Sequence, residues 1–238
     1  MMFSLLSGVM AQKDEPVEER DYKDLLTLFV TEKYDKVVMR ATKYTEDEKT
    51  KKDPLPYLFL SMSYFEISKK DEYKTRFPDA FKLCLKNIKS YASKDKERKY
   101  AAEYEDFFSK LRGSIISEGE LMLDQQKYTK AKTMFQALLN IDENDAGAKI
   151  YLGITMLAMK SKKESETELG EAKKLLQEKK AATGTKELDD LLKNGLMTYA
   201  TQLSSDGNKS VAKEWMDLGM EYFKDDKEYK VTYETIAD

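Results

Sequence analysis

The residues that come nearest to a metal-binding site form a short acidic segment at 142–147, with the sequence DENDAG. Its side-chain oxygens and its glycine at the sixth position match the start of a calcium-binding loop. Such a loop also needs an oxygen ligand at its fifth position and a bidentate acid at its twelfth, which here are Ala146 and Gly153. The same residues fit a turn between two helices, so we interpret the segment as a turn and expect no metal site.

Catalysis by an acid, a base or a nucleophile has few candidate residues. The chain has no histidine, and its one cysteine, Cys84, lies in an apolar helical segment where cysteine acts as a small filler. The neighbouring acids Asp189 and Asp190 would have to converge in a pocket, and a helical charge pattern gives no sign of that. We expect no enzyme, no catalytic residue and no cofactor, and keep a carboxylate-based hydrolase as a third hypothesis.

The balance of charge argues against nucleic acid as a partner. Lys and Arg total 41 against 44 Asp and Glu, a formal net charge of −3, so no net positive field attracts phosphates. The lysine clusters at 49–52, 160–163 and 179–180 fall at expected turns or helix ends, where cations are favourable. No later segment approaches the ~20 apolar residues of a membrane span, so we expect no membrane insertion.

The first residues suggest export. Residues 1–11 are apolar, and Val9 and Ala11 occupy the small-residue positions that precede a signal-peptide cleavage site. A basic stretch before the apolar run is missing, so we predict a truncated signal peptide at 1–11 and a polar linker at 12–19. This predicts an exported protein, periplasmic or extracellular. The alternative is an ordinary chain terminus in a cytoplasmic protein.

The elements that position these residues are expected to be helices. Charged residues make up 36% of the chain, with only 10 Gly and 4 Pro, a composition that favours helices over strands. The expected helix pairs fall at 20–48, 57–88, 112–145, 146–181 and 188–222. We interpret 95–124 as one long helix or two nearly collinear ones, with Gly113 as the expected place for a break. Residues 69–78 and 177–186 are expected to be longer connections.

A repeat is visible in the middle of the chain. Gly119 and Gly153 lie 34 residues apart, and Tyr128, Ala131 and Phe135 share one helical face. The segment at 137–153 resembles the junction between two tetratricopeptide repeats. This resemblance implies an all-α fold, an α-solenoid of about four to five antiparallel helix pairs (a superhelix) over residues 20–226, followed by a C-terminal capping tail at 227–238.

The same resemblance implies a function in protein binding. In that family the first helices of successive pairs line a concave groove that receives a partner segment. The corresponding positions here are Met62, Phe65, Glu66, Ile116, Glu120, Leu123, Ile150, Ile154 and Leu157. Because several are apolar, they either bury against a neighbouring helix or form an apolar binding patch. We predict a scaffold or adaptor that binds a protein or peptide partner in a cell-envelope assembly. The alternative is a carbohydrate or small-ligand binding protein that uses tyrosines and Trp215 as stacking platforms.

Overall fold

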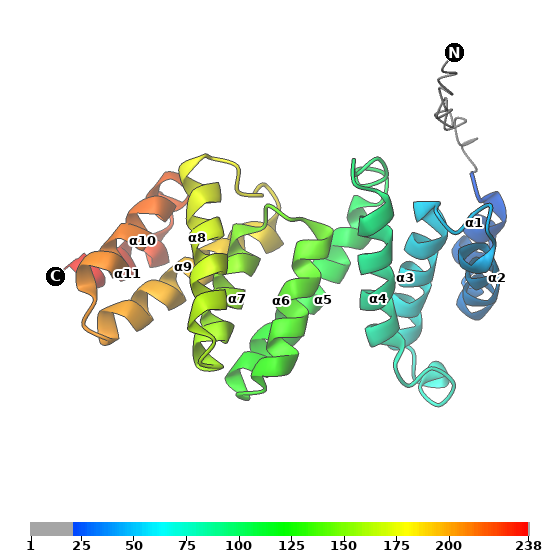
Figure 1. Ribbon diagram of the computed structural model, residues 1–238, viewed down its shortest axis with the longest axis horizontal. Helices are drawn as coiled ribbons and strands as arrows, with labels where there is room; N and C mark the ends of the chain where they lie inside the picture. Colours follow the sequence, from blue (N-terminus) through cyan, green and yellow to red (C-terminus); the bar gives the residue numbers. More distant parts are fainter. Residues whose placement is uncertain (1–20, 238) are drawn as a thin grey trace, which may run out of the picture.

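The computed structural model describes residues 21–237, and that part of the chain is all-helical, as predicted, with no β-strand (Figure 1). The helices are α1 (Lys23–Val30), α2 (Tyr34–Glu46), α3 (Pro54–Ser68), a 3₁₀ turn η1 (Asp71–Tyr73), α4 (Ala80–Lys94), α5 (Glu105–Asp124), α6 (Tyr128–Ile141), α7 (Ala146–Ala158), α8 (Lys162–Gln177), α9 (Lys186–Ser205), α10 (Lys209–Phe223) and α11 (Lys227–Ala237). The predictions for residues 1–11, 12–19 and Asp238 lie outside the described part. No described helix is long and apolar enough to cross a membrane.

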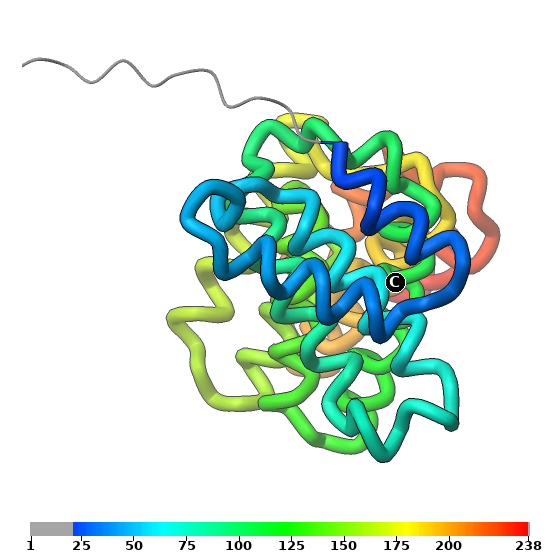
Figure 2. Tube along the Cα trace, turned by 90° about the vertical axis from the view of Figure 1, so that its right-hand side faces the viewer, coloured from blue at the N-terminus to red at the C-terminus, as the bar shows by residue number. Residues whose placement is uncertain are grey.

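The helices pack in successive pairs: α1 with α2, α3 with α4, α5 with α6, α7 with α8, and α9 with α10. Short turns join the members of most pairs, so their helices run antiparallel. Figure 1 shows the pairs side by side along the longest axis, from α1 and α2 at one end to α10 and α11 at the other. Seen along that axis in Figure 2, the α1–α2 pair covers the near end and the later helices lie behind it.

The two central pairs use equivalent residues at their closest approach. A Cβ atom on Gly119 of α5 would lie 3.0 Å from the Phe135 ring of α6, and one on Gly153 of α7 would lie 2.5 Å from Leu169 Cγ of α8. Glycine is therefore needed at both positions because the partner helix fills the space of a side chain. Both contacts join residues 16 apart, and the second lies 34 residues after the first.

The small residue on the second helix repeats as well. Ala131 of α6 and Ser165 of α8 are each 12 residues after the glycine of their pair and are fully buried. The Ser165 hydroxyl donates to the Gly153 carbonyl (2.8 Å), which satisfies its buried oxygen. In α9 and α10 the pattern Ala200, Ala212 and Met216 has the same spacing and is also fully buried. Three consecutive pairs thus share one packing scheme.

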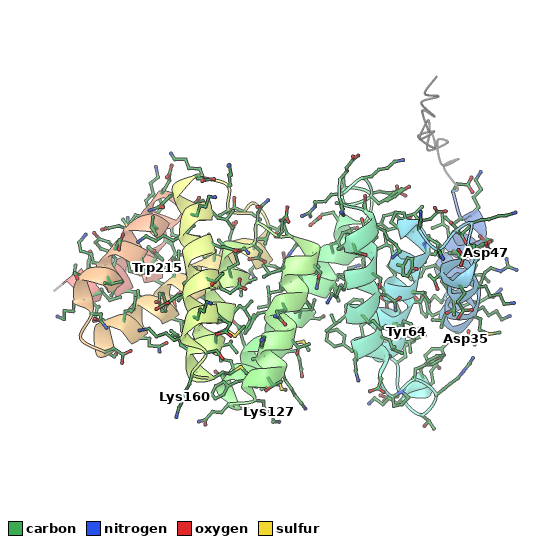
Figure 3. The ribbon with its side chains drawn as sticks, viewed as in Figure 1. Asp35, Asp47, Tyr64, Lys127, Lys160 and Trp215 are labelled. Atoms are coloured by element: carbon green, nitrogen blue, oxygen red, sulfur yellow. The ribbon has the colours of Figure 1, made fainter. Side chains whose placement is uncertain are left out.

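The turns inside these pairs also share one geometry. The first helix ends on a residue in the left-handed conformation at Glu32, Gln126, Lys160 and Gly207. After α5, the Lys127 N–H donates to the Met122 carbonyl (2.8 Å), the bond of a Schellman cap, and an equivalent bond follows α7. Figure 3 shows Lys127 and Lys160, in the α5–α6 and α7–α8 turns, on the same edge of the molecule.

The prediction for residues 95–124 was wrong in two respects. Residues 95–104 form turns instead of helix, and α5 then runs without a break from Glu105 through Gly113. The chain leaves the helix because the Asp95 carboxylate accepts hydrogen bonds from the backbone N–H groups of Lys99 (2.9 Å) and Tyr100 (3.2 Å). A short side chain that captures nearby amides competes with helix formation. The first helix of the predicted 112–145 unit therefore begins seven residues earlier, at Glu105.

The buried apolar residues form two clusters that meet at α7. One runs from Tyr22 to Met156 and includes Leu191, and the other runs from Ala146 to Ile236. Helix α11 packs on α9 and α10 and contributes buried residues to the second cluster. Tyr229 of α11 is fully buried, and its hydroxyl donates to the Met216 carbonyl (2.8 Å). The residues of α7 from Ala146 to Met156 are all buried, because α6, α8 and α9 pack around it.

Candidate functional site

The predicted groove positions divide into two groups. Met62, Phe65, Ile150 and Ile154 are buried, and the remaining five are partly exposed: Glu66, Ile116, Glu120, Leu123 and Leu157. Phe65 makes an edge contact with the Phe107 ring of α5, at 5.8 Å between ring centroids. The four buried side chains thus follow the first of the two alternatives, burial against a neighbouring helix.

Helix α9 covers the face of α7 where two of these residues lie. A Cβ atom on Gly195 of α9 would sit 3.3 Å from Ile150 Cγ2, and one on Gly147 of α7 would sit 2.7 Å from the Leu192 nitrogen. The two backbones therefore approach closely because each helix offers a glycine. As a result, α9 occupies the surface that Ile150 would otherwise present.

Glu120 of α5 is one of the partly exposed residues at the predicted groove positions. Its carboxylate accepts a hydrogen bond from the hydroxyl of Tyr151 on α7 (3.1 Å), and the Tyr151 ring stacks on Phe135 at 5.0 Å. Burial raises the pKa of Glu120 above its usual range, and the hydrogen bond from Tyr151 opposes that shift. Ile116 and Leu123 flank it on α5 and are half-buried. On α5 the groove positions thus place the Glu120 carboxylate between two apolar side chains, with Asp124 close enough to raise its pKa further.

The acidic segment at 142–147 is the turn between α6 and α7. Asp145 caps α7 by accepting the Ala148 N–H (2.8 Å), and Asp142 forms an ion pair with Arg98 (3.0 Å). Asp145 is 1% exposed, and burial raises its pKa to about 6, against the favourable charge of buried Arg112. The carboxylates of Asp142 and Asp145 therefore bind different groups, the Arg98 guanidinium and the backbone of α7. Among residues 21–237, no group of three or more Asp, Glu, His or Cys residues is placed to hold a metal ion.

The other reactive side chains are also held in structural roles. Cys84 is fully buried, its sulfur lies 3.2 Å from the Ser61 hydroxyl, and burial raises the pKa of its thiol to about 12. Asp189 accepts the backbone N–H of Gly184 (3.1 Å) and so orders the end of the 177–186 insertion. A thiol with so high a pKa carries almost no thiolate at neutral pH and is a poor nucleophile.

Several lysines of the three clusters are paired with acids. Lys51 contacts Glu48 (2.5 Å), Lys180 contacts Glu178 (2.7 Å), and Lys179 reaches Glu221 of α10 (2.5 Å). These are exposed ion pairs, which contribute little to stability.

Trp215 offers no stacking surface. Trp215, labelled in Figure 3, is 4% exposed and meets the Tyr199 ring edge-on at 5.1 Å between centroids. Each tyrosine of the chain is buried or only partly exposed. A sugar ring needs an open aromatic face, and the face of Trp215 is packed in the core.

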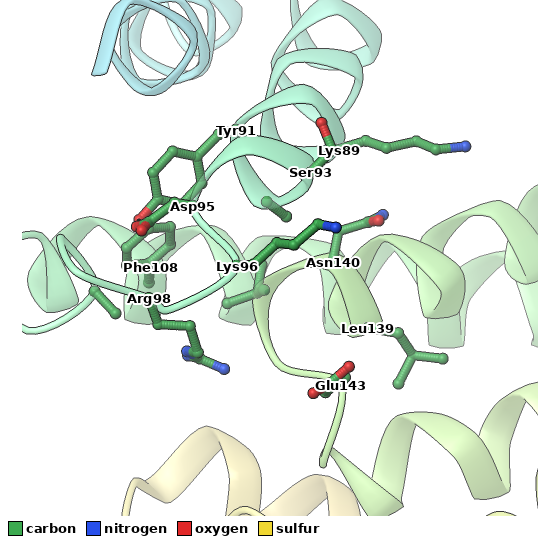
Figure 4. Close-up of a pocket in the computed structure, with 13 residues that line it drawn as sticks. Lys89, Tyr91, Ser93, Asp95, Lys96, Arg98, Phe108, Leu139, Asn140 and Glu143 are labelled. Carbon is green, nitrogen blue, oxygen red and sulfur yellow. The ribbon is translucent and has the colours of Figure 1, made fainter. Parts of the chain in front are cut away.

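A cleft that the sequence did not predict lies where α4 and α6 end (Figure 4). It has a volume of about 530 Å³ and is bounded by the ends of both helices, by the turns at 95–104 and by Phe108 of α5. This volume is in the range of ligand-binding clefts. The signal that could have found it is Asp95, four residues after Tyr91, where the helix gives way to turns. The sequence alone does not reveal that the Asp95 carboxylate accepts hydrogen bonds from the backbone.

Comparison with protein-family models, with curated proteins and with solved structures returned no match.

Proposed function

We propose that this chain is a tetratricopeptide-type α-solenoid whose function is to hold other proteins together, without catalysis. The observation that carries the proposal is the 34-residue equivalence of α5–α6 and α7–α8. The close helix approach at Gly119 recurs at Gly153, and the left-handed turn at Gln126 recurs at Lys160. Repeats that bury a shared core leave an extended surface, which is what such proteins use for recognition.

The binding surface in this proposal is the exposed part of the first-helix face, at Ile116, Glu120 and Leu123 of α5 and Leu157 of α7. Half-buried apolar side chains around one hydrogen-bonding group suit a partner segment that inserts an apolar side chain. We also propose, from Val9 and Ala11, that the protein is exported and works in an envelope assembly. The carbohydrate alternative loses its one tryptophan, because Trp215 is enclosed.

The test is capture of partners with matched variants. Ile116→Lys places a charge on the proposed surface, and Gln136→Lys places one on the exposed side of α6 as the control. The tagged proteins are crosslinked in the native compartment, and the recovered proteins are compared by quantitative mass spectrometry. We expect a partner that is recovered with the unmodified chain and Gln136→Lys but lost with Ile116→Lys, while circular dichroism shows all three folded. Recovery of the same proteins by all three, or of no specific partner, would contradict the proposal.

A further inference from the structure

The cleft at the ends of α4 and α6 is separate from the first-helix face. None of the nine predicted groove residues lines it. It exists because residues 95–104 do not continue α4 but loop outward before α5 begins. The loop is held at both sides: the Tyr91 hydroxyl donates to Asp95 (2.5 Å), and Arg98 reaches across to Asp142 in the α6–α7 turn (3.0 Å). The cleft is therefore built by specific bonds between described residues.

The floor of the cleft is apolar. Tyr91 and Phe108 are buried, with ring centroids 5.8 Å apart, and Ala92, Ala101 and Leu139 are only partly covered. Because the Tyr91 hydroxyl is already bonded to Asp95, its ring adds mainly apolar surface. An apolar side chain placed here would lose contact with water on several sides, which favours binding.

The rim of the cleft carries two lysines with no acid bound to them. Lys89 of α4 and Lys96 of the loop are exposed, and neither forms an ion pair within residues 21–237. The charges of the other lining residues are largely engaged: Asp95 accepts three hydrogen bonds, and Arg98 is paired with Asp142. Glu143 is the remaining exposed acid of the lining and lies across the cleft from Lys89 in Figure 4. The open charge at the rim is thus mainly positive.

We propose that this cleft is a second binding site, and that it receives an acidic segment of a partner protein with one apolar anchor side chain. The anchor fills the floor formed by Tyr91 and Phe108, and flanking carboxylates meet Lys89 and Lys96. Such an arrangement, a desolvated apolar centre inside a charged rim, is common where proteins recognise peptides. The inference deepens the proposed function, since it rests on the chain being a protein-binding scaffold and adds the chemistry of a partner.

Peptide titration tests the proposal directly. The probe is a short synthetic peptide with one phenylalanine flanked by aspartates, and the two control peptides replace either the aspartates by lysines or the phenylalanine by alanine. Binding is followed by NMR on the full chain, through the methyl groups of Ala92 and Ala101, which line the cleft. We expect saturable shifts of these methyl signals with the probe and none with either control peptide.

Matched protein variants locate the rim contacts. Lys89→Glu and Lys96→Glu should each weaken binding of the probe by about fivefold at low salt, because an exposed attraction becomes a repulsion. Lys86→Glu, also on an exposed position of α4 but outside the cleft, is the control and should leave the affinity unchanged. Since all three positions are exposed, the variants should fold.

Three results would overturn the inference: no binding of the probe, equal binding to Lys96→Glu and the unmodified chain, or equally tight binding of phenylpropionate alone. The last would mark the cleft as a small-molecule site. These failures are distinguishable from failure of the proposed function. If the Ile116→Lys variant still loses a partner while the acidic probe does not bind, the scaffold proposal stands and only the cleft inference falls.

Discussion

The buried carboxyl of Asp145 gives the sharpest test of the electrostatics of this fold. The side chain caps α7 and is 1% exposed, and one of its two oxygens has no hydrogen-bond partner within the described residues. Its charge therefore loses hydration without full compensation, although Arg112 offsets part of the loss and Asp142 in the same turn adds to it. We predict that Asp145→Asn stabilises the protein at neutral pH, because asparagine keeps the cap and carries no charge.

The magnitude follows from the pKa of Asp145. The folded-state pKa is about 6, against an ordinary value of 3.8. The folded state therefore binds the Asp145 proton more tightly than the unfolded state does. The protonated acid contributes to the free energy of unfolding at low pH, and this contribution is lost as pH rises between about 4 and 6. At 1.36 kcal/mol per pKa unit, ionisation of Asp145 costs about 3 kcal/mol of stability at neutral pH.

The assay is urea unfolding of the unmodified chain and of Asp145→Asn at a series of pH values from 4 to 7.5. Because other groups titrate alike in both proteins, the difference in unfolding free energy isolates Asp145. We expect that difference to move in favour of the variant by about 2.4 kcal/mol across the range, because the unfolded chain is already partly ionised at pH 4. Asp225→Asn, at an exposed position before α11, controls for the substitution itself. Parallel pH profiles for the unmodified chain and Asp145→Asn would refute the reasoning.

Further predictions concern packing, turns and reactivity. Gly153→Ala should lower stability by about 1–3 kcal/mol, because its Cβ would meet Leu169 Cγ at 2.5 Å. Gly170→Ala, whose Cβ would meet no atom within 4 Å, should raise stability by up to about 1 kcal/mol. Thermal unfolding of the two variants compares them. Gln126→Gly should raise stability by about 1 kcal/mol, because Gln126 has φ 58° in the turn after α5, and an unchanged urea midpoint would count against this. Cys84 should react with a thiol reagent only at the rate of unfolding, as a labelling time course in and out of denaturant would reveal.

The sequence predicted the helices where periodicity and turn residues agree. The spacing of Gly119 and Gly153 and the longer connection at 177–186 each mark features that the structure contains. These signals are local, because a helix pair joined by a short turn is set by residues close in the chain.

The loop at 95–104 and the coverage of α7 could not be predicted in the same way. The composition around Asp95 favours a helix, and only the hydrogen bonds that its carboxylate accepts explain why the chain leaves it. Likewise, Ile150 is at a position that the repeat pattern assigns to the groove, yet it is buried because α9 and Gly195 approach α7 closely. Such contacts depend on how pairs distant in the sequence stack, which a periodic pattern does not encode.

The burial of α7 from Ala146 to Met156 has a consequence for how the molecule unfolds. Ala148, Tyr151, Leu152 and Met156 belong to the N-terminal cluster, whereas Ala146, Ile150 and Ile154 belong to the C-terminal one. Opening either half exposes one side of the same helix, so neither half can come apart without weakening the other. Linear repeat arrays often unfold from an end. Because both clusters share α7, we expect the two ends to unfold in one cooperative transition, with the α7 amides among the last to exchange hydrogen for deuterium.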